Sequence, residues 1–292
     1  MAHQSSASSG WLYPWDLHFS TLSGSLPLAY VEEGLAEPPL LFIHGLAGDH
    51  RHWTKNIETL SKYRRCLAID LPGHGHSGKA DYPFTLNFFI QVIRAFLEEK
   101  GLSQVILVGH SMGAQIATLL ALWHPQLIKH LVLIAPAGLE EFNTLEKLWL
   151  KNLSSPTALK DGTLDHLLHS FETNFYRSRP EAKKFLDPSL LAGNQEELER
   201  YSELMSKCVS AMLDETVYDR LPNLSMHVSI IFGENDFLIP NKLIHPTHTT
   251  RSLAENAVNK IPAARLFILP QAGHFVNWEK AEEVNNIIIE AL

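Results

Sequence analysis

One segment of the chain, VILVGHSMGAQIATLLAL, constrains the fold more than any other. Its first residues form a short apolar run of the kind found in strands buried on both faces, and its last residues have the apolar spacing of a helix. Only Gly109, His110, Ser111, Met112 and Gly113 separate the two patterns. We therefore expect a buried strand that turns sharply into a helix, with Ser111 at the turn.

The two glycines of this segment suggest why a serine stands there. Such a turn holds the serine in a strained backbone conformation, and crowding leaves room only for glycine two residues before and two residues after it, at Gly109 and Gly113. The helix behind Ser111 presents free N–H groups and its positive dipole end to a developing oxyanion. The pattern alone leaves open that Ser111 merely caps the helix, but the strand–turn–helix context favours a nucleophile.

Apolar runs of strand length alternate with helical patterns along the rest of the chain, which predicts a mostly parallel sheet flanked by helices. The first two strands are more polar and are joined by a Ser-Gly turn, which predicts an antiparallel edge hairpin. We expect eight strands, at Leu17–Leu22, Leu26–Val31, Leu40–His44, Arg65–Asp70, Val105–Gly109, Leu131–Ala135, Val228–Gly233 and Ala264–Leu269. We expect helices at Leu86–Lys100, Ser111–Trp123 and Glu279–Leu292.

The alternation stops after the sixth strand. Residues 139–222 have apolar residues at helical spacing and no convincing strand. One apolar face comprises Leu145, Leu148, Trp149 and Leu153, and another comprises Leu164, Leu167, Leu168 and Phe171. So long a connection between strands of one sheet favours a helical cap over a site rather than helices that only fill out the core. We expect a core of residues 1–138 and 223–292, interrupted by a cap of residues 139–222.

A serine hydroxyl is a poor nucleophile unless a histidine and an orienting acid assist it. Such partners are expected where later strands end, because the carboxyl edge of a parallel sheet carries the site. The strand HVSIIFG is followed by Glu234 and Asp236, and the last strand, RLFILP, is followed by His274. We expect Asp236 and His274 to act with Ser111, and Glu234 remains an alternative acid.

Composition excludes several other kinds of protein. Hydrophobic residues make up 45% of the chain and charged residues 19%, which indicates a folded protein. Lys and Arg number 24 against 32 Asp and Glu, a net charge of -8, whereas a nucleic-acid surface normally has a basic excess. We therefore expect no nucleic-acid partner. The two cysteines predict neither a disulfide framework nor a cysteine-rich metal site.

The apolar runs are short throughout the chain. None reaches about 18 residues, so we expect no integral membrane segment. The first ten residues, MAHQSSASSG, lack the basic and apolar zones of a signal peptide. With two cysteines and no such signals, the sequence is typical of a cytoplasmic protein.

One glycine-rich stretch partly matches two nucleotide-binding motifs, but its residues do not fit the chemistry of either. Gly73, Gly75 and Gly78 satisfy the dinucleotide pattern G-x-G-x-x-G, but Pro83 intervenes before the next helix, so no helix N-terminus meets a pyrophosphate. The same stretch nearly spells a P-loop, yet Ala80 stands where a Ser or Thr would bind magnesium. We expect no nucleotide cofactor.

The chain has 16 histidines, and two of them, His74 and His76, have the H-x-H spacing of a metal pair. The residues that follow are Ser, Gly and Lys rather than the Asp and His of a metallo-hydrolase, so we expect no metal site. His44 and His110 join these two in the loops at the sheet edge. We interpret all four as loop hydrogen-bonding and packing residues.

Five motifs together resemble the α/β-hydrolase family: HGLAG (44–48), DLPGHGHS (70–77), GHSMG (109–113), FGENDFLIP and AGHFVNWE, in the order found in that family. The resemblance implies an eight-stranded α/β-hydrolase fold with a helical cap after strand six, a Ser-Asp-His triad and no cofactor. It also implies that the backbone N–H groups of Leu46 and Met112 form an oxyanion hole, supported by His44 and Gly45.

Within the family, the motifs are similar to those of carboxylesterases and monoacylglycerol-lipase-like members, which implies ester hydrolysis through an acyl-enzyme on Ser111. A serine nucleophile argues against the members that cleave epoxides or carbon–halogen bonds with an aspartate. Two alternatives remain: C–C-bond hydrolases of vinylogous diketones, which use the same triad, and small-molecule receptors built on the fold. The aromatic residues of the cap suit an apolar acyl or aryl group; they are Phe142, Trp149, Phe171, Phe175 and Tyr176.

Overall fold

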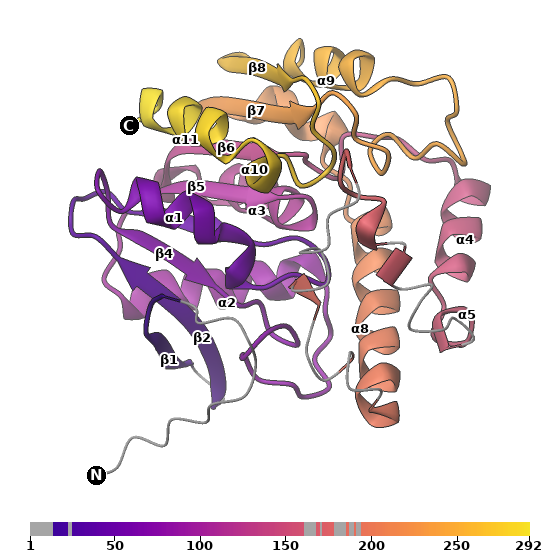
Figure 1. Cartoon of the computed structure of the whole chain (residues 1–292), viewed down its shortest axis with the longest axis horizontal. Coiled ribbons are helices and arrows are strands. Elements are labelled where there is room, and N and C mark those ends of the chain that lie inside the picture. Colours follow the sequence, from indigo (N-terminus) through magenta and orange to yellow (C-terminus); the bar gives the residue numbers. More distant parts are fainter. Residues whose placement is uncertain are drawn as a thin grey trace.

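The computed structural model describes residues 14–22, 25–160, 168–169, 171–177, 185–186, 190 and 194–292 (Figure 1). Its centre is an eight-stranded sheet, as the sequence predicts. The strands are β1 (Leu17–Leu22), β2 (Leu26–Glu33), β3 (Leu40–Ile43), β4 (Cys66–Ile69), β5 (Val105–His110), β6 (Ile128–Ile134), β7 (His227–Gly233) and β8 (Ala264–Leu269). Their order is β1-β2-β4-β3-β5-β6-β7-β8, and all neighbouring pairs from β4 to β8 are parallel.

The two N-terminal strands form the predicted antiparallel hairpin at one edge of the sheet. Leu22 pairs with Leu26 at the turn, and β2 then pairs antiparallel with β4. Phe19 in β1 is 58% exposed, because only one face of this strand is covered. The strand ends differ slightly from the prediction, most of all in β6, which begins at Ile128 rather than Leu131.

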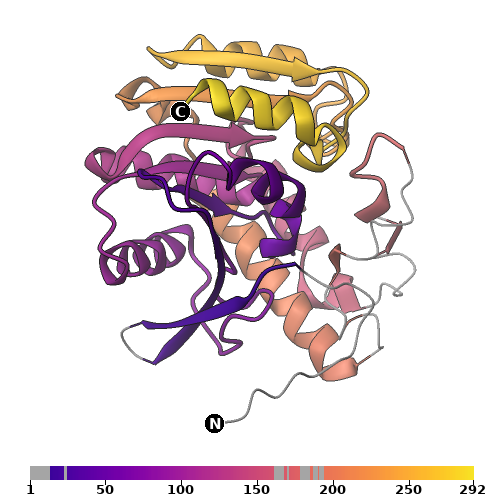
Figure 2. The same ribbon diagram turned by 60° about the vertical axis from the view of Figure 1, so that its left-hand side comes forward.

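Helices cover both faces of the sheet (Figure 2). Successive residues of β3 and β5 point to opposite faces of the sheet, and each face belongs to a separate buried apolar layer. Because both faces are buried, nearly every position in these strands is apolar. The first layer packs against α2 (Leu86–Glu99), α3 (Met112–Trp123) and α9 (Thr250–Val258). The second packs against η1 (His50–Trp53), α1 (Thr54–Leu60), α10 (Val276–Glu279) and α11 (Ala281–Glu290).

The C-terminal helix differs from the prediction of one helix over Glu279–Leu292. Glu279 ends the short helix α10, and α11 begins at Ala281. Between them Lys280 has φ −126° and ψ 44°, which is not helical, so the chain changes direction there. Among the described helices, none combines the length and apolar character needed to cross a membrane.

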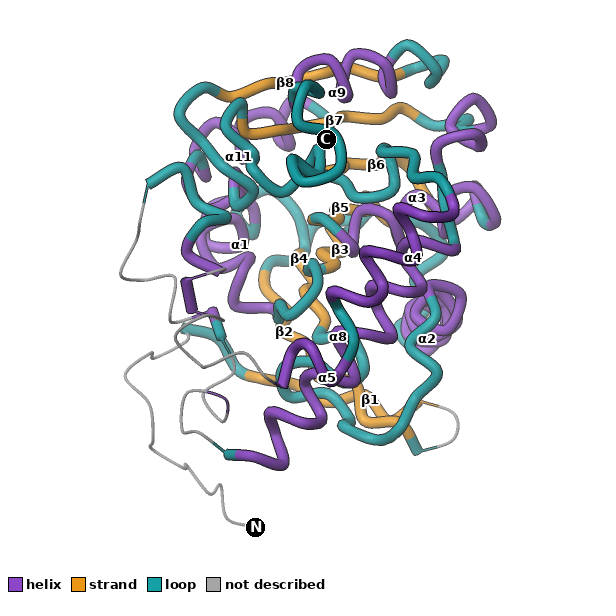
Figure 3. The backbone as a smooth tube through the Cα atoms, turned by 90° about the vertical axis from the view of Figure 1, so that its right-hand side faces the viewer, coloured by secondary structure: helices purple, strands orange, loops and turns teal. Residues whose placement is uncertain are grey.

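The described elements of residues 139–222 are helical; the first three lie on the side of the carboxyl ends of the strands (Figure 3), and the last leads into the start of β7. They are α4 (Thr144–Leu153), α5 (Pro156–Lys160), α8 (Gln195–Asp214) and η4 (Tyr218–Asn223), which ends one residue beyond the predicted boundary. Helix α4 begins with a capping box: Asn143 accepts the N–H groups of Leu145 and Glu146, and the Glu146 carboxylate accepts the Asn143 N–H. That this segment is a separate cap domain remains a prediction.

The apolar face predicted on α4 is not buried. Leu145 is 76% exposed, and the other three residues, Leu148, Trp149 and Leu153, are between 43% and 56% exposed. Of the second predicted face, Leu164 and Leu167 lie outside the described residues. Phe171 is buried, in a cluster with Phe175, Phe185, Phe275 and Trp278.

Candidate active site

Ser111 occupies the turn between β5 and α3, where the sequence places it. Its backbone has φ 55° and ψ −119°, a conformation that residues other than glycine rarely adopt. The N–H of Ser111 donates to the carbonyl of Ile134 at 2.9 Å, which holds the turn against the neighbouring strand β6. Strained backbone that the surrounding structure enforces is often found at functional sites.

The glycines on either side of Ser111 are required by packing. A Cβ on Gly109 would lie 2.5 Å from the carbonyl oxygen of Gly113, and a Cβ on Gly113 would lie 2.3 Å from that of Ile43 in β3. Real Cβ atoms essentially never approach another atom within 3.0 Å. The spacing that the sequence showed therefore reflects close contact of α3 with β5 and β3.

Asp236 and His274 meet at the ends of β7 and β8. The Nδ1 of His274 lies 2.9 Å from the Oδ2 of Asp236, and both side chains are buried. The other Asp236 oxygen, Oδ1, accepts the N–H groups of Leu238 and Ile239 at 2.9 and 3.0 Å. Because a carboxylate only accepts, Nδ1 carries the proton of this bond and Nε2 is left with a free lone pair.

Glu234, the alternative acid, lies elsewhere. Its side chain is about half exposed and its carboxylate is 3.6 Å from the Arg251 guanidinium. The structure thus brings Asp236, and not Glu234, to the imidazole of His274.

The HGLAG turn lies against the nucleophile turn. A Cβ on Gly45 would lie 3.0 Å from the Cβ of Ser111, so the two backbones approach closely. The buried ring of His44 fixes this turn: its Nδ1 donates to the Gly45 carbonyl at 2.7 Å and its Nε2 accepts the N–H of Leu71 at 2.9 Å. Burial lowers the pKa of His44, which keeps the ring neutral and able to make both bonds. Within the described part of the chain, the Leu46 N–H has no hydrogen-bond acceptor.

Sequence reasoning missed the roles of the contacts that hold His274 in place. The Nε2 of His110 donates to the carbonyl of His274 at 3.0 Å, and the His274 N–H donates to the Asn174 carbonyl at 2.7 Å. Glu279 accepts the N–H groups of Gly273 at 2.7 Å and of Tyr176 at 3.0 Å. The only signal for these roles was the place of His110 and Glu279 inside two of the family's motifs.

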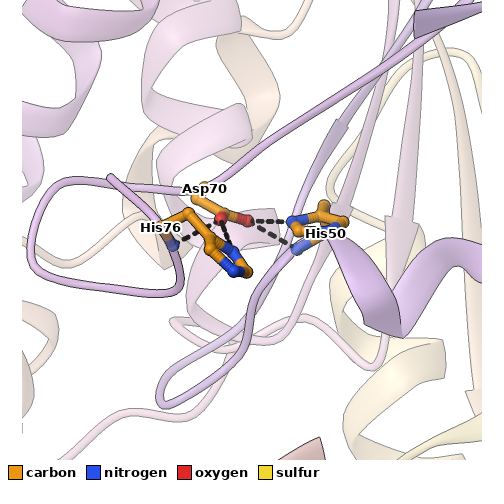
Figure 4. Close-up of side chains that lie close together, drawn as sticks. All are labelled: His50, Asp70 and His76. Carbon is orange, nitrogen blue, oxygen red and sulfur yellow. Dashed lines mark hydrogen bonds and ion pairs between the residues drawn. The ribbon is translucent and has the colours of Figure 1, made fainter. Parts of the chain in front are cut away.

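His74 and His76 do not form a pair. The Nδ1 of His74 lies 3.2 Å from the Pro72 carbonyl, whereas His76 lies beside Asp70 (Figure 4). The Asp70 carboxylate accepts the backbone N–H groups of His50 and His76 at 2.7 and 2.8 Å, and the Nδ1 of His50 at 2.7 Å. Its acceptor positions are thus used to hold the loop in place.

Two groups of side chains in the described ranges bring three potential metal-ligating atoms within 4.8 Å of one another. One is His50, Asp70 and His76; the other is Glu140, His245 and His248. In the second group the Nδ1 of His245 is 2.6 Å from Oε1 of Glu140, a short hydrogen bond. The reaction chemistry predicted for Ser111 uses neither group, and a metal-free mechanism stays a prediction.

A cavity of about 550 Å³ connects the core residues with the helical segment. Ser111, His274 and Leu46 line it from the core, and α4, α5 and α8 line it from the other side. Its described lining is mostly apolar and contains no lysine or arginine. Such a cavity, with a few polar groups converging at one end, is the usual form of a small-molecule site.

Comparison with known protein families identifies the family of this chain. The sequence model of the family described as alpha/beta hydrolase fold matches residues 38–281. The chain belongs to the alpha/beta hydrolase fold family. Its sequence is 30% identical over 264 residues to the dihydrolipoyllysine-residue acetyltransferase component of the acetoin cleaving system of Pseudomonas putida. The match covers 87% of this alpha/beta hydrolase chain and 63% of that protein, so the chain spans less than two thirds of its relative.

Solved structures share the fold of this alpha/beta hydrolase. A probable hydrolytic enzyme of Pseudomonas aeruginosa superposes with a TM-score of 0.83 at 23% identity, covering 97% of this chain and 96% of that one. An esterase of Thermogutta terrifontis superposes with a TM-score of 0.74 at 21% identity, covering 94% and 97%. These likenesses show the fold, and with the family match they support a hydrolase.

Proposed function

We propose that this alpha/beta hydrolase cleaves carboxylic esters through an acyl-enzyme on Ser111, with Asp236 and His274 completing the triad. The observation that carries the proposal is the hydrogen bond of 2.9 Å between His274 and Asp236, beside a cavity that Ser111 also lines. The strained backbone of Ser111 adds to it, since φ 55° lifts the residue out of the regular strand and helix on either side.

In the first half of the reaction, Oγ of Ser111 attacks the ester carbonyl while Nε2 of His274 takes its proton. Asp236 keeps the imidazole in the tautomer with the proton on Nδ1 and stabilises the imidazolium that forms. The carbonyl oxygen becomes an oxyanion, which the N–H groups of Leu46 and Met112 receive; each donor of this kind is worth about 3 kcal/mol of barrier. His274 then gives its proton to the departing alcohol, and the acyl-enzyme is left.

In the second half, water replaces the alcohol. His274 takes a proton from the water as its oxygen attacks the acyl carbon, and the same two N–H groups hold the second oxyanion. Collapse of this intermediate breaks the bond to Ser111, which recovers its proton from His274, and the carboxylic acid leaves. Every group required belongs to the protein, so the proposed mechanism calls for no cofactor.

The cavity favours an uncharged, apolar substrate. Its described lining offers no lysine or arginine to pair with an acid, and Glu140 would repel one. This weighs against the dienone acids that C–C-bond hydrolases of this fold cleave. An ester with an apolar acyl or aryl group fits the lining better.

The test is labelling of Ser111 by a fluorescent organophosphonate ester. We expect one label per folded chain, loss of labelling in Ser111→Ala, and normal labelling in Ser154→Ala, since Ser154 also lines the cavity but its hydroxyl donates to the Leu150 carbonyl at 2.9 Å. Turnover of p-nitrophenyl esters should disappear with the label. A folded wild-type protein that takes up no label and hydrolyses no ester would refute the proposal, and ligand-dependent partner binding that survives Ser111→Ala would favour a receptor.

A further inference from the structure

Helix α8 has three distinct faces. One is buried against the core through Leu204, Cys208 and Ala211, and another is exposed at Glu203, Lys207 and Asp214. The third lines the cavity and is apolar apart from one phenol hydroxyl; it consists of Tyr201, Met205, Val209, Met212 and Leu213. These residues follow the spacing of one helical stripe, so the cavity runs along the helix rather than across it.

The stripe gives the cavity a length and a direction. From Tyr201 to Met212 the helix rises by roughly 16 Å, at 1.5 Å per residue. Leu150 and Leu153 of α4 and Leu159 of α5 line the same cavity. We call the apolar part of the cavity lined by this stripe and by these three leucines the slot.

The C-terminal end of α8 is held against α3, the helix that begins just after the nucleophile. Gln115 lies one helical turn after Ser111 on α3, and its Nε2 donates to the carbonyls of Met212 and Glu215 at 2.9 and 3.0 Å. Lys151 of α4 lies 2.7 Å from a carboxylate oxygen of Asp214, so α4 and α8 meet at this end. Tyr201 lies at the other end of the stripe, next to Arg200, which donates to the Gly73 carbonyl at 3.1 Å.

We infer that the slot holds an unbranched alkyl chain of the substrate, and that Val209 and Met205 set how long this chain can be. The inference rests on the proposed ester hydrolysis at Ser111. An apolar space that follows a helix for about three turns, in a cavity that also holds one reactive group, suits a straight chain better than a compact aryl ring. The flexible side chains of Met205 and Met212 adapt to such a chain without a specific polar contact.

The inference predicts a dependence of kcat/KM on chain length. Each methylene that enters the slot leaves water, which is worth about 0.8 kcal/mol, so kcat/KM should rise by up to about fourfold per carbon until the slot is full. The measurement uses two ester series kept in monomeric solution: p-nitrophenyl esters of graded acyl chain, and acetates of graded straight-chain alcohols. The series that shows the rise identifies which half of the ester occupies the slot.

Two substitutions of residues that line the slot test how long a chain it accepts. Val209→Trp should cut off the rise, lowering kcat/KM for long chains by tenfold or more and for the shortest ester much less, because a tryptophan there fills the slot part-way along. Met205→Trp should cut it off at a longer chain, because Met205 lies about 6 Å farther along α8 from the end that Gln115 holds. Glu203→Trp is the matched control, since Glu203 is on the exposed face, and it should leave the whole profile unchanged.

A binding measurement separates this inference from the proposed reaction. Straight-chain methyl ketones of graded length are not hydrolysed, and their dissociation constants, measured by titration calorimetry, should follow the same chain-length profile in wild type and variants. Tight, length-dependent binding without ester turnover would refute the reaction but keep the slot. Ester turnover with no length dependence in either series, or equal losses for short and long chains in Val209→Trp and Met205→Trp, would overturn the slot.

Discussion

The contact between α3 and β3 behind the nucleophile can be broken by adding one methyl group. In Gly113→Ala the new Cβ would stand 2.3 Å from the carbonyl oxygen of Ile43 and 2.4 Å from that of His44. Both atoms are backbone, one in the last residue of β3 and one in the residue after it, and β3 lies between β4 and β5 in the middle of the sheet, so they cannot turn away. Relief requires α3 and the end of β3 to move apart.

The size of the effect follows from two opposing contributions. Alanine is favoured over glycine inside a helix by about 1 kcal/mol, whereas overpacking costs about 1–3 kcal/mol. Because the clash is with backbone on both sides, we take the upper end and expect a net loss of about 2 kcal/mol, or about 4 °C in Tm. The shift also moves the His44–Leu46 turn, and losing one proposed oxyanion donor costs about 10²–10³ in kcat.

The assay compares Tm by calorimetry with kcat for a p-nitrophenyl ester, corrected for the fraction of sites that an organophosphonate labels. Gly101→Ala is the control: Gly101 has φ 65° but no atom within 4 Å of a new Cβ, so it should lower stability by about 1–2 kcal/mol through backbone strain and leave kcat alone. An unchanged Tm in Gly113→Ala would refute the packing argument. A lowered Tm with unchanged kcat would refute the placement of the oxyanion donor.

Two further predictions concern charged groups. Asp236→Asn should lower kcat by about 10⁴, because an amide no longer holds His274 in the required tautomer, whereas Glu234→Gln should leave kcat nearly unchanged; equal losses would reopen the choice of acid. Burial disfavours both charged forms in the pair of His50 and Asp70, but their mutual attraction outweighs it and raises the pKa of His50 above 6.5 and lowers that of Asp70 well below 3.8. The pair therefore stabilises the fold fully between pH 3.8 and 6.5, the ordinary pKa values of the two groups. This stabilisation is lost as the pH rises through the raised pKa of His50 or falls through the lowered pKa of Asp70. The Tm difference between wild type and His50→Gln should be larger at pH 6 than at pH 9, and a difference independent of pH would refute the pairing.

The central strands were predictable because parallel strands covered on both faces need apolar residues at nearly every position. Helices α1 and α9 were not predicted, because they cover the sheet with few large apolar residues. Helix α9 buries Leu253, Ala254 and Ala257, and α1 buries Ile57 and Leu60 beside a polar asparagine. Ala254 and Ala257 add little to the apolar pattern of the sequence, although in the structure both are buried in the core.

The sequence could nominate Ser111, Asp236 and His274 because each lies in the turn or loop after a strand, and the carboxyl ends of parallel strands share one edge. The contacts of His110 and Asn174 with the backbone of His274 could not be predicted, because a hydrogen bond to a main-chain atom does not depend on the residue type that carries it. The slot could not be predicted either. Periodicity shows that α8 has apolar residues on two faces, but it does not say which face meets the core and which faces the cavity.

The hydrogen bonds around His274 have a consequence for how this enzyme can be engineered. Asn174 and Tyr176 belong to the helical segment, yet they are bonded to His274 and Glu279, and a Cβ on Gly273 would lie 2.6 Å from the Asn174 carbonyl oxygen. The helical segment is therefore not an exchangeable module. A chimaera that takes residues 139–222 from another member of the family must import the matching C-terminal loop as well, or its histidine will lose the backbone contacts that hold it.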